Sequence, residues 1–451
     1  MGLTSMYAGL SGLNANALQL SLIGNNLSNS NTVGYKASSA TFQDLLSQTL
    51  SGGSDTTNPM QVGLGTTAAG TMMNLTQGSL QATGISSNLA IQGAGFFVVS
   101  SGQGGNNYTR AGNFNVDAKG DLVTADGLFV QGYTQKDPTT NKIIADGTLS
   151  SINIPPGTLF PPTATTDVQL ISNLDANATT GTVSSSAIRV VDSLGSSHQL
   201  NFVFTKGANP GEWSYDVTID GGEVTGGTAG TAYSLIGAGG AAPTAPAGTM
   251  AFDASGKITT VDGNPVLNGT PPPVLDPAVV PIHITTPTFA NGAAALSFDW
   301  DVAKADGASY DSIITSYAAP SATSSSSQNG FAAGSLSSFT VSEDGTVIGI
   351  FSNGQTAELA RIALATFNNP NGLLKMGSNN YSASTSSGEP SLGAAADGGR
   401  GKIAASSLEL SNVDIASEFI NMIISERGYQ ANSRVISTTD QVLQEAINLV
   451  R

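Results

Sequence analysis

Apolar residues recur at helical spacing through the first 27 residues of the chain. The intervals alternate between three and four, which is the a/d pattern of a helical seam. No Asp, Glu, Lys or Arg precedes Lys36, so this helix is predicted to have close neighbours on several sides instead of a solvated outer face. The seam residues are Leu3, Met6, Leu10, Leu13, Ala17, Leu20, Gly24 and Leu27.

Glycine makes this first helix weak in isolation. Gly2, Gly9, Gly12 and Gly24 lie within it, and each costs about 1 kcal/mol of helix propensity relative to alanine. The segment is therefore expected to be poorly helical alone in water and to need a partner.

A second seam runs through the C-terminal segment that follows Ser411. Its apolar positions recur every seven residues: Ile415, Met422, Tyr429, Ile436, Leu443 and Val450. The other seam of this helix is weaker, because Phe419 and Ile447 fit it while Glu426, Ser433 and Asp440 interrupt it. Ser411 and Asp414 have the spacing of a capping box, which predicts the start of a long helix.

Two interpretations of these ends remain open. Both helices could pack on a globular domain of their own chain. Alternatively, they form a terminal pair whose remaining faces are buried only against other copies of the chain.

The interior of the chain predicts strands. An apolar run follows Asn88, and turn signals at residues 117–120 and 126–127 divide residues 108–133 into a meander of short strands. In a later region, Trp213, Tyr215, Val217 and Ile219 alternate with polar residues, as Leu296, Phe298, Trp300 and Val302 do, which is typical of half-buried strands. Residues 42–50 fit a short helix or a strand equally well.

Composition marks boundaries between these regions. Prolines punctuate residues 150–166, and the Ser-rich residues 318–335 are interpreted as a linker. Residues 221–287 are rich in Gly, Ala, Thr and Pro and predict long loops between strands.

Charge and cysteine content exclude several classes of protein. The 451 residues carry a formal charge of -16 and no cysteine, which argues against nucleic acid and anionic membrane surfaces as partners and excludes disulfides and cysteine metal sites. The N-terminus lacks the pattern of a cleavable signal peptide, and no apolar run is long enough to span a bilayer, so no membrane insertion is expected.

No catalytic, cofactor or metal site is predicted. His198 and His283 are the two histidines, and neither has a partner at ligand spacing. Asp299 and Asp301 share one strand face, and Gly93-Ala94-Gly95 lacks the spacing of a nucleotide loop. We therefore expect the chain not to be an enzyme.

Two long blocks at the chain ends resemble a known family. The block GLNANALQLSLIGNNLSNSNTVGYK and the closing NMIISERGYQANSRVISTTDQVLQEAINLV are similar to the terminal signatures of the bacterial flagellar axial proteins, which build the rod, the hook and their junctions. The interior GFFVV and YTRAGNF segments are similar to an inner β domain of that family, and length and interior together are most similar to its hook subunits. The motif residues are Asn25, Asn26, Asn31, Gly34, Tyr35 and Lys36.

The resemblance implies a fold and a set of partners. The fold would be mainly β, with the terminal helices forming a coiled-coil-like pair and nested β domains between them. The implied protein is a homopolymer outside the cell, exported by the flagellar type III apparatus, that contacts the distal rod protein, the hook cap and the hook–filament junction proteins.

The predicted organisation is discontinuous. It comprises a helical domain (1–30 and 411–451), a connecting segment (31–74), an inner β domain (75–160 and 325–410) and an outer inserted β domain (161–324). Composition alone would also allow three domains in series. Another flagellar axial protein, or a β-rich surface adhesin or enzyme with export ends, remains the alternative.

Overall fold

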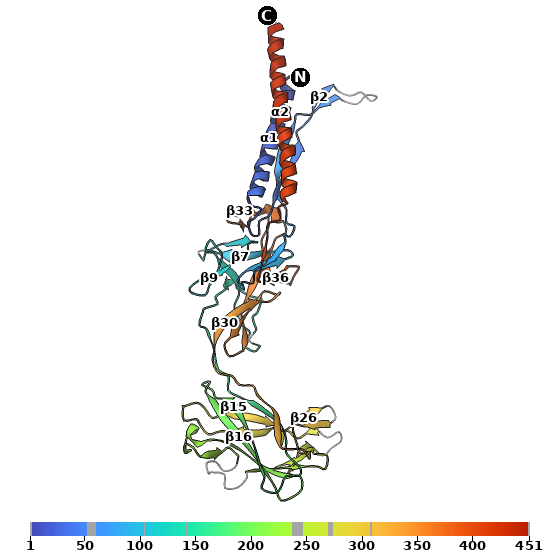
Figure 1. The fold of residues 1–451 in the computed structure, drawn as a ribbon. Coiled ribbons are helices and arrows are strands. Elements are labelled where there is room, and N and C mark those ends of the chain that lie inside the picture. Colours follow the sequence, from blue (N-terminus) through green and yellow to red (C-terminus); the bar gives the residue numbers. More distant parts are fainter. Residues whose placement is uncertain are drawn as a thin grey trace. The chain divides into compact units, whose positions relative to one another are not determined.

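The computed structural model describes residues 2–51, 60–102, 104–140, 142–236, 247–268, 274–306 and 309–449. They divide into two compact units. Unit 1 comprises Met1–Thr158, Ser337–Ile350 and Thr356–Arg451, and unit 2 comprises Leu159–Leu336 and Phe351–Gln355. Strands predominate, and one long α-helix lies at each end of the chain, which confirms the predicted fold class (Figure 1).

Helices α1 (Gly2–Ser28) and α2 (Ile415–Leu449) lie side by side in unit 1 and run antiparallel (Figure 1). The capping box with Ser411 at the N-cap predicted a start three residues too early, because α2 begins at Ile415. Asp414 is the N-cap, because its carboxylate accepts hydrogen bonds from the backbone N–H groups of Ala416 and Ser417. The hydroxyl of Ser411 instead accepts from the N–H of Val413, ahead of the helix.

A two-stranded ribbon follows α1. Strand β1 (Ser38–Asp44) pairs antiparallel with β4 (Thr66–Met73), and β2 (Gln48–Ser51) pairs with β3 (Met60–Val62). The ribbon touches α1 where the N–H of Thr66 donates to the hydroxyl of Ser11 at 3.1 Å. Residues 42–50, for which helix and strand were equally possible, therefore contribute to strands.

Strands from both sides of the inserted segment share one sheet in unit 1. Its order runs β30 (Gly334–Val341), β31 (Thr346–Phe351), β32 (Thr356–Thr366), β11 (Phe129–Tyr133), β7 (Phe96–Ser100), β8 (Asn106–Thr109), β34 (Asn380–Ser382), β33 (Leu374–Gly377). The apolar run of β7 is buried on both faces, as a central strand requires. Shorter strands complete the unit: β5 (Leu80–Ala82), β6 (Leu89–Gln92), β9 (Asn115–Val116), β10 (Leu122–Val123), β12 (Ser150–Ser151), β35 (Ser391–Ala394), β36 (Lys402–Ala405) and β37 (Ser407–Glu409).

Aromatic side chains fill one side of the unit 1 sheet. Phe96 packs edge-on against Phe367 and Tyr381, with ring centroids 6.0 and 5.6 Å apart, and Tyr108 packs against Phe367 at 4.8 Å. Edge-to-face contacts of this kind add to the burial of the rings. The predicted meander of residues 108–133 thus supplies part of a real core.

Two larger sheets form most of the described part of unit 2. The first runs β15 (Val183–Val191), β16 (Ser197–Lys206), β17 (Glu212–Asp220), β19 (Gly248–Phe252), β20 (Ile258–Val261), β21 (Asn264–Pro265), with β18 (Ala232–Ser234) on β17. The second runs β24 (Ile282–Thr285), β25 (Ser297–Asp301), β14 (Asp167–Asn173), β28 (Ile314–Thr315), with β29 (Ala322–Gln328) on β14. Further short strands are β13 (Leu159–Phe160), β22 (Leu267–Asn268), β23 (Val274–Leu275), β26 (Ala303–Asp306) and β27 (Ser309–Ser312). Of these, β22 with β23 and β26 with β27 form two-stranded sheets.

Two predictions for this region were wrong. The Ser-rich stretch interpreted as a linker contains β29, which pairs with β14 over six residues from Val168↔Gln328 to Asn173↔Ala322. Its side chains are mostly exposed hydroxyls, so backbone pairing and not apolar patterning creates the strand. Residues 221–287, expected as long loops, carry the short strands β18 to β24 among the described residues.

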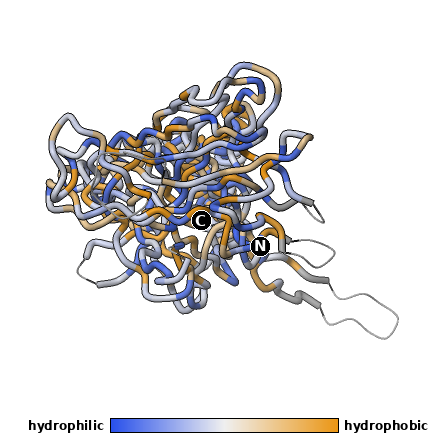
Figure 2. Tube along the Cα trace, turned by 90° about the horizontal axis from the view of Figure 1, so that it is seen from below, coloured by the Kyte–Doolittle hydropathy of each residue, from blue (hydrophilic) through white to orange (hydrophobic). Residues whose placement is uncertain are grey.

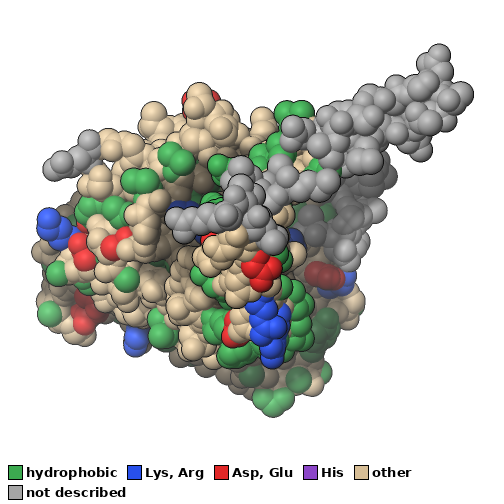
Figure 3. Space-filling model, turned by 90° about the horizontal axis from the view of Figure 1, so that it is seen from above, with side chains coloured by type: hydrophobic (Ala, Val, Ile, Leu, Met, Phe, Trp, Pro, Cys, Tyr) green, Lys and Arg blue, Asp and Glu red, His purple; other side chains and the backbone are tan. Residues whose placement is uncertain are grey.

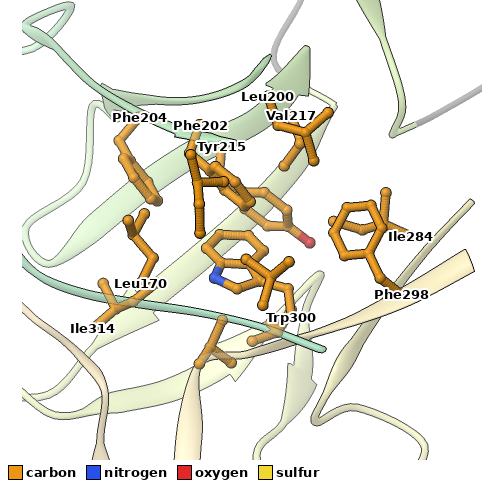
Figure 4. Close-up of a cluster of buried hydrophobic side chains, with 14 of the residues drawn as sticks. Leu170, Leu200, Phe202, Phe204, Tyr215, Val217, Ile284, Phe298, Trp300 and Ile314 are labelled. Carbon is orange, nitrogen blue, oxygen red and sulfur yellow. The ribbon is translucent and has the colours of Figure 1, made fainter. Parts of the chain in front are cut away.

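The core of unit 2 gathers around Trp300, as the alternation of β17 and β25 predicted (Figure 4). The indole lies 4.7 Å from Phe202, 6.1 Å from Phe204 and 5.5 Å from Tyr215, measured between ring centroids. Hydropathy colouring shows short apolar and polar stretches interspersed along the described chain (Figure 2).

His198 has a structural environment in unit 2. Its Nε2 lies 3.0 Å from a carboxylate oxygen of Asp192, its Nδ1 lies 2.8 Å from Glu223, and its ring stacks on Phe289. Burial would raise the pKa of Asp192, but hydrogen bonds from His198, from Asn291 and from two backbone N–H groups outweigh it and lower that pKa.

Asp192→Asn should therefore make the unfolding of unit 2 less sensitive to acid. A lowered carboxyl pKa stabilises the fold above the unfolded value of about 4 and loses that effect as the pH falls through the folded value. The variant should be less stable than the parent at neutral pH, and the difference should shrink below about pH 4. Denaturant titrations followed by fluorescence of the two tryptophans measure this. Asp311→Asn, at an exposed position of the same unit, is the control, and a constant difference across the pH range would contradict the prediction.

Candidate self-assembly surface

The face that α1 turns to α2 is made of small and polar residues. A methyl group added at Gly9 would lie 3.2 Å from Cγ1 of Ile436, and one at Gly12 would lie 2.7 Å from Nδ2 of Asn432. The two backbones therefore approach closely only because side chains are missing. The buried positions among residues 5–28 are Gly9, Ile23 and Asn26.

The predicted N-terminal seam lies beside this contact face. Leu10 is 45% exposed and Ala17 is exposed, whereas Met6, Leu13, Leu20, Gly24 and Leu27 are half-buried. The side chain of Leu3 lies outside the described residues. The most apolar stripe of α1 is therefore only partly covered by its own chain.

The predicted C-terminal seam is divided between two faces of α2. Met422, Ile436 and Leu443 are half-buried, and Ile436 packs over Gly9 of α1. Ile415 and Tyr429 are exposed, and Val450 lies outside the described residues. The structure thus brings one part of this seam against α1 and leaves the other part uncovered.

A larger apolar surface on α2 was missed by the heptad analysis. Phe419, Ile420, Ile423 and Ile424, which we call the α2 stripe, are between 48% and 63% exposed. Their i, i+1, i+4, i+5 spacing places them on one side of the helix, and the run FINMII was the signal available in the sequence. Val435, Val442 and Ile447 add exposed apolar side chains further along α2.

No charged residue interrupts the run from Phe419 to Ile424 in α2. On the face drawn in Figure 3, the charged side chains of the described residues are scattered among uncharged ones. Contiguous exposed apolar side chains are a common feature of surfaces that bind another protein.

A buried ionic cluster ties the base of the helices to the sheet of unit 1. One carboxylate oxygen of Glu409 accepts a 2.6 Å hydrogen bond from the ammonium of Lys36. The other oxygen lies 3.4 Å from Nη1 of Arg110. Lys36 and Glu409 are fully buried, and Arg110 is nearly so. Burial lowers the pKa values of Lys36 and Arg110, and the charge of Glu409 opposes that effect. We call these three residues the junction triad.

Three further motif residues complete this junction. The side-chain oxygen of Asn26 accepts from the hydroxyl of Tyr35 and from the N–H of Ser38, and its amide donates to Ser38 and to Glu418 of α2. Gly34 has a φ of +68°, and a Cβ there would lie 2.6 Å from the backbone of Arg110. Asn26, Gly34, Tyr35 and Lys36 thus have intramolecular roles.

Asn25 and Asn31 do not share those roles. Both are exposed, and Asn25 lies beside a cleft of about 590 Å³ in unit 1 that Lys375 and Tyr381 also line. The oxygen of the Asn25 side chain accepts from the amide of Asn29.

Four known domain families match segments of the chain. The flagellar basal body protein FlaE D2 domain matches residues 159–331, and the flagellar hook protein FlgE/F/G D1 domain matches residues 90–184. The ends match the flagella basal body rod protein family (6–36) and the flagellar basal body rod FlgEFG protein C-terminal family (404–449).

Curated relatives align along almost the whole length. The chain is 33% identical to the flagellar hook protein FlgE of Borreliella burgdorferi and 34% identical to that of Treponema pallidum, with 99% of each chain covered. It is 32% identical to the protein of the same name from Salmonella typhimurium, with 99% of this chain and 100% of that one covered. The chain belongs to the flagellar hook protein FlgE family.

Membership of the hook family defines the broad role. The chain is a structural subunit of the bacterial flagellar hook, and the alternative of a different axial protein is not favoured. Among the described residues, neither helix is long and apolar enough to cross a bilayer, and no group of three metal-binding side chains lies together.

Glu409→Gln should strongly destabilise unit 1 of this hook-family chain. The substitution keeps the shape but leaves the two buried cations without a countercharge, which typically costs about 3–5 kcal/mol. Hydrogen exchange of the β7 amides measures the loss. Glu343→Gln, which removes an exposed pair with Lys402, is the matched control and should change little. Equal protection in both variants would show that the triad does not hold the unit together.

Proposed function

We propose that many copies of this chain polymerise into the flexible, curved tube of the hook, which couples the rod to the filament and transmits torque. The observation that carries the proposal is the exposed α2 stripe. A single chain leaves these large side chains in water, while glycine and asparagine, together with Ile436, lie at its own helix–helix contact.

The energetic argument favours burial between copies. Fully burying a Leu, Ile or Phe side chain stabilises by about 1.5–3 kcal/mol relative to exposing it. The four residues of the α2 stripe are about half exposed, so their burial would contribute several kcal/mol at each contact between copies. Repeated along a polymer, contacts of this size offset the entropy lost on association.

The predicted seam residues belong to the same proposed surface. Leu10 on α1, and Ile415 and Tyr429 on α2, are already exposed, and the half-buried members flank them. The full proposed set is Leu3, Met6, Leu10, Leu13, Leu20, Leu27, Ile415, Met422, Tyr429, Ile436, Leu443 and Val450, together with the α2 stripe.

Unit 2 supports the proposed flexibility. Strand β29 presents small hydroxyl side chains to the outside, and such a surface can make weak contacts that slide. In the proposed tube, the terminal helices lock copies together lengthwise, and the chain has no catalytic role. The proposed partners are the distal rod protein, the hook cap, the hook–filament junction proteins and the type III export apparatus, and the proposed location is outside the cell.

Deleting residues 1–27 should abolish polymers and leave the β units folded. Helix α1 contributes to the assembly surface, whereas each β unit has a core of its own. Cells whose only copy carries the deletion, like cells lacking the chain, should have basal bodies with complete rods and no hooks by electron microscopy. Unchanged tryptophan fluorescence would confirm that unit 2 folds, and hooks of normal length would refute the proposal.

Ile420→Ser combined with Ile424→Ser should prevent polymerisation without reducing the stability of the monomer. Both side chains are exposed, so their removal costs the folded chain little, while the α2 stripe loses two of its four apolar side chains. Sedimentation of the purified chain measures polymer yield, and thermal unfolding measures monomer stability. Leu194→Ser, an exposed leucine of unit 2, is the matched control. Equal polymer yield in the double variant and the control would argue against the α2 stripe.

A further inference from the structure

Both terminal helices contain the same five-residue pattern, Gly-x-x-Ala-Asn. In α1 it is GLNAN at residues 12–16, and in α2 it is GYQAN at residues 428–432. Because the helices are antiparallel, the glycine of each pattern faces the asparagine of the other.

The contacts are reciprocal. A methyl group on Gly12 would lie 2.7 Å from Nδ2 and 2.9 Å from Cγ of Asn432. A methyl group on Gly428 would lie 2.7 Å from Oδ1 of Asn16. Asn16 is further held by its own helix, since its amide donates to the carbonyl of Gly12 at 2.7 Å. Each asparagine side chain therefore occupies the space that a glycine leaves open.

We propose that this reciprocal pair of contacts, the Asn–Gly clasp, fixes the axial register of α1 against α2 and thereby decides which apolar side chains a neighbouring copy meets. The inference rests on the proposed function, because register matters to assembly only if the helices form the contact between copies.

The rest of the helix pair does not set the register as sharply. Apolar seams that repeat every seven residues remain matched after a slip of one heptad. The clasp does not tolerate such a slip. A slip of α1 along α2 by seven residues would set Asn432 against Gln19 in one direction and Asn16 against Asn421 in the other. Two polar side chains would then meet where one asparagine now covers a glycine.

Gly12→Ala tests the clasp in the full-length chain. The added methyl overlaps Asn432, and overpacking of this kind should raise the critical concentration for polymerisation about tenfold. Gly24→Ala is the matched control, because it is the same change in the same helix with no atom within 4 Å of the new methyl. Combining Gly12→Ala with Asn432→Ala should restore polymerisation to within about threefold of the parent, since the overlapping side chain is gone.

Register itself can be measured, because the chain has no cysteine of its own. Spin labels on Asn14→Cys and Gln430→Cys, two exposed positions, report the distance between the helices within one copy when labelled chains are diluted into unlabelled polymer. A slip of one heptad would displace the helices by about 10 Å. Gly12→Ala should shift or broaden the distance distribution, and the double variant should return it.

The outcomes separate this inference from the proposed function. If Gly12→Ala polymerises like Gly24→Ala with an unchanged spin-label distance, the clasp is overturned. If Asn432→Ala fails to restore the Gly12→Ala chain, the pairing of these two residues is overturned. Polymers formed by the chain lacking residues 1–27 would instead refute the proposed function, whatever the Gly12 variant does.

Discussion

One buried carboxylate holds together three segments that are distant in the sequence. Glu409 lies 299 residues from Arg110 and 373 residues from Lys36, yet its two oxygens contact both cations. The N–H of Gly78 adds a 3.0 Å hydrogen bond to the same carboxylate, and the guanidinium of Arg110 lies 5.4 Å from the Phe96 ring centroid. Desolvation makes such clusters weak sources of net stability, so we interpret the triad as a determinant of specificity. The triad thereby joins the end of β8, the segment after α1 and the segment before α2.

The helix pair reverses the usual distribution of residues in a two-helix contact. Antiparallel helices that are stable alone bury apolar side chains between them and expose polar ones. Here Gly9, Gly12, Asn16 and Asn432 lie at the contact, and the α2 stripe lies outside. The pair is therefore an incomplete core, which covers Ile436 only partly and leaves the α2 stripe exposed.

Prediction from the sequence succeeded for the strands of unit 2 and was incomplete for the terminal helices. The alternation around Trp213 and Trp300 identified inward-facing residues, because the apolar side chains of β17 and β25 pack into the core of unit 2. Periodicity also found the apolar stripes of the helices, but it assigned the C-terminal stripe to a single face. It treated the glycines only as a loss of helix propensity and did not show that they make room for side chains of the other helix. A search for apolar periodicity identifies the most apolar side of a helix. In a subunit that polymerises, that side can face another copy instead of its own chain. Strand β29 escaped prediction because its pairing with β14 depends on a partner about 150 residues away.

The glycines of α1 couple its folding to that of α2. Each glycine weakens an isolated helix by about 1 kcal/mol, and α1 has no charged side chain with which to offset the loss. Helix α2 differs, because Asp414 caps its first turn and Glu418 adds a favourable charge near the positive end of the helix dipole. The same glycines that destabilise α1 alone provide the space into which Ile436 and Asn432 fit. We therefore expect α1 to be stable only when it packs against α2. The junction triad joins the segments next to both helices.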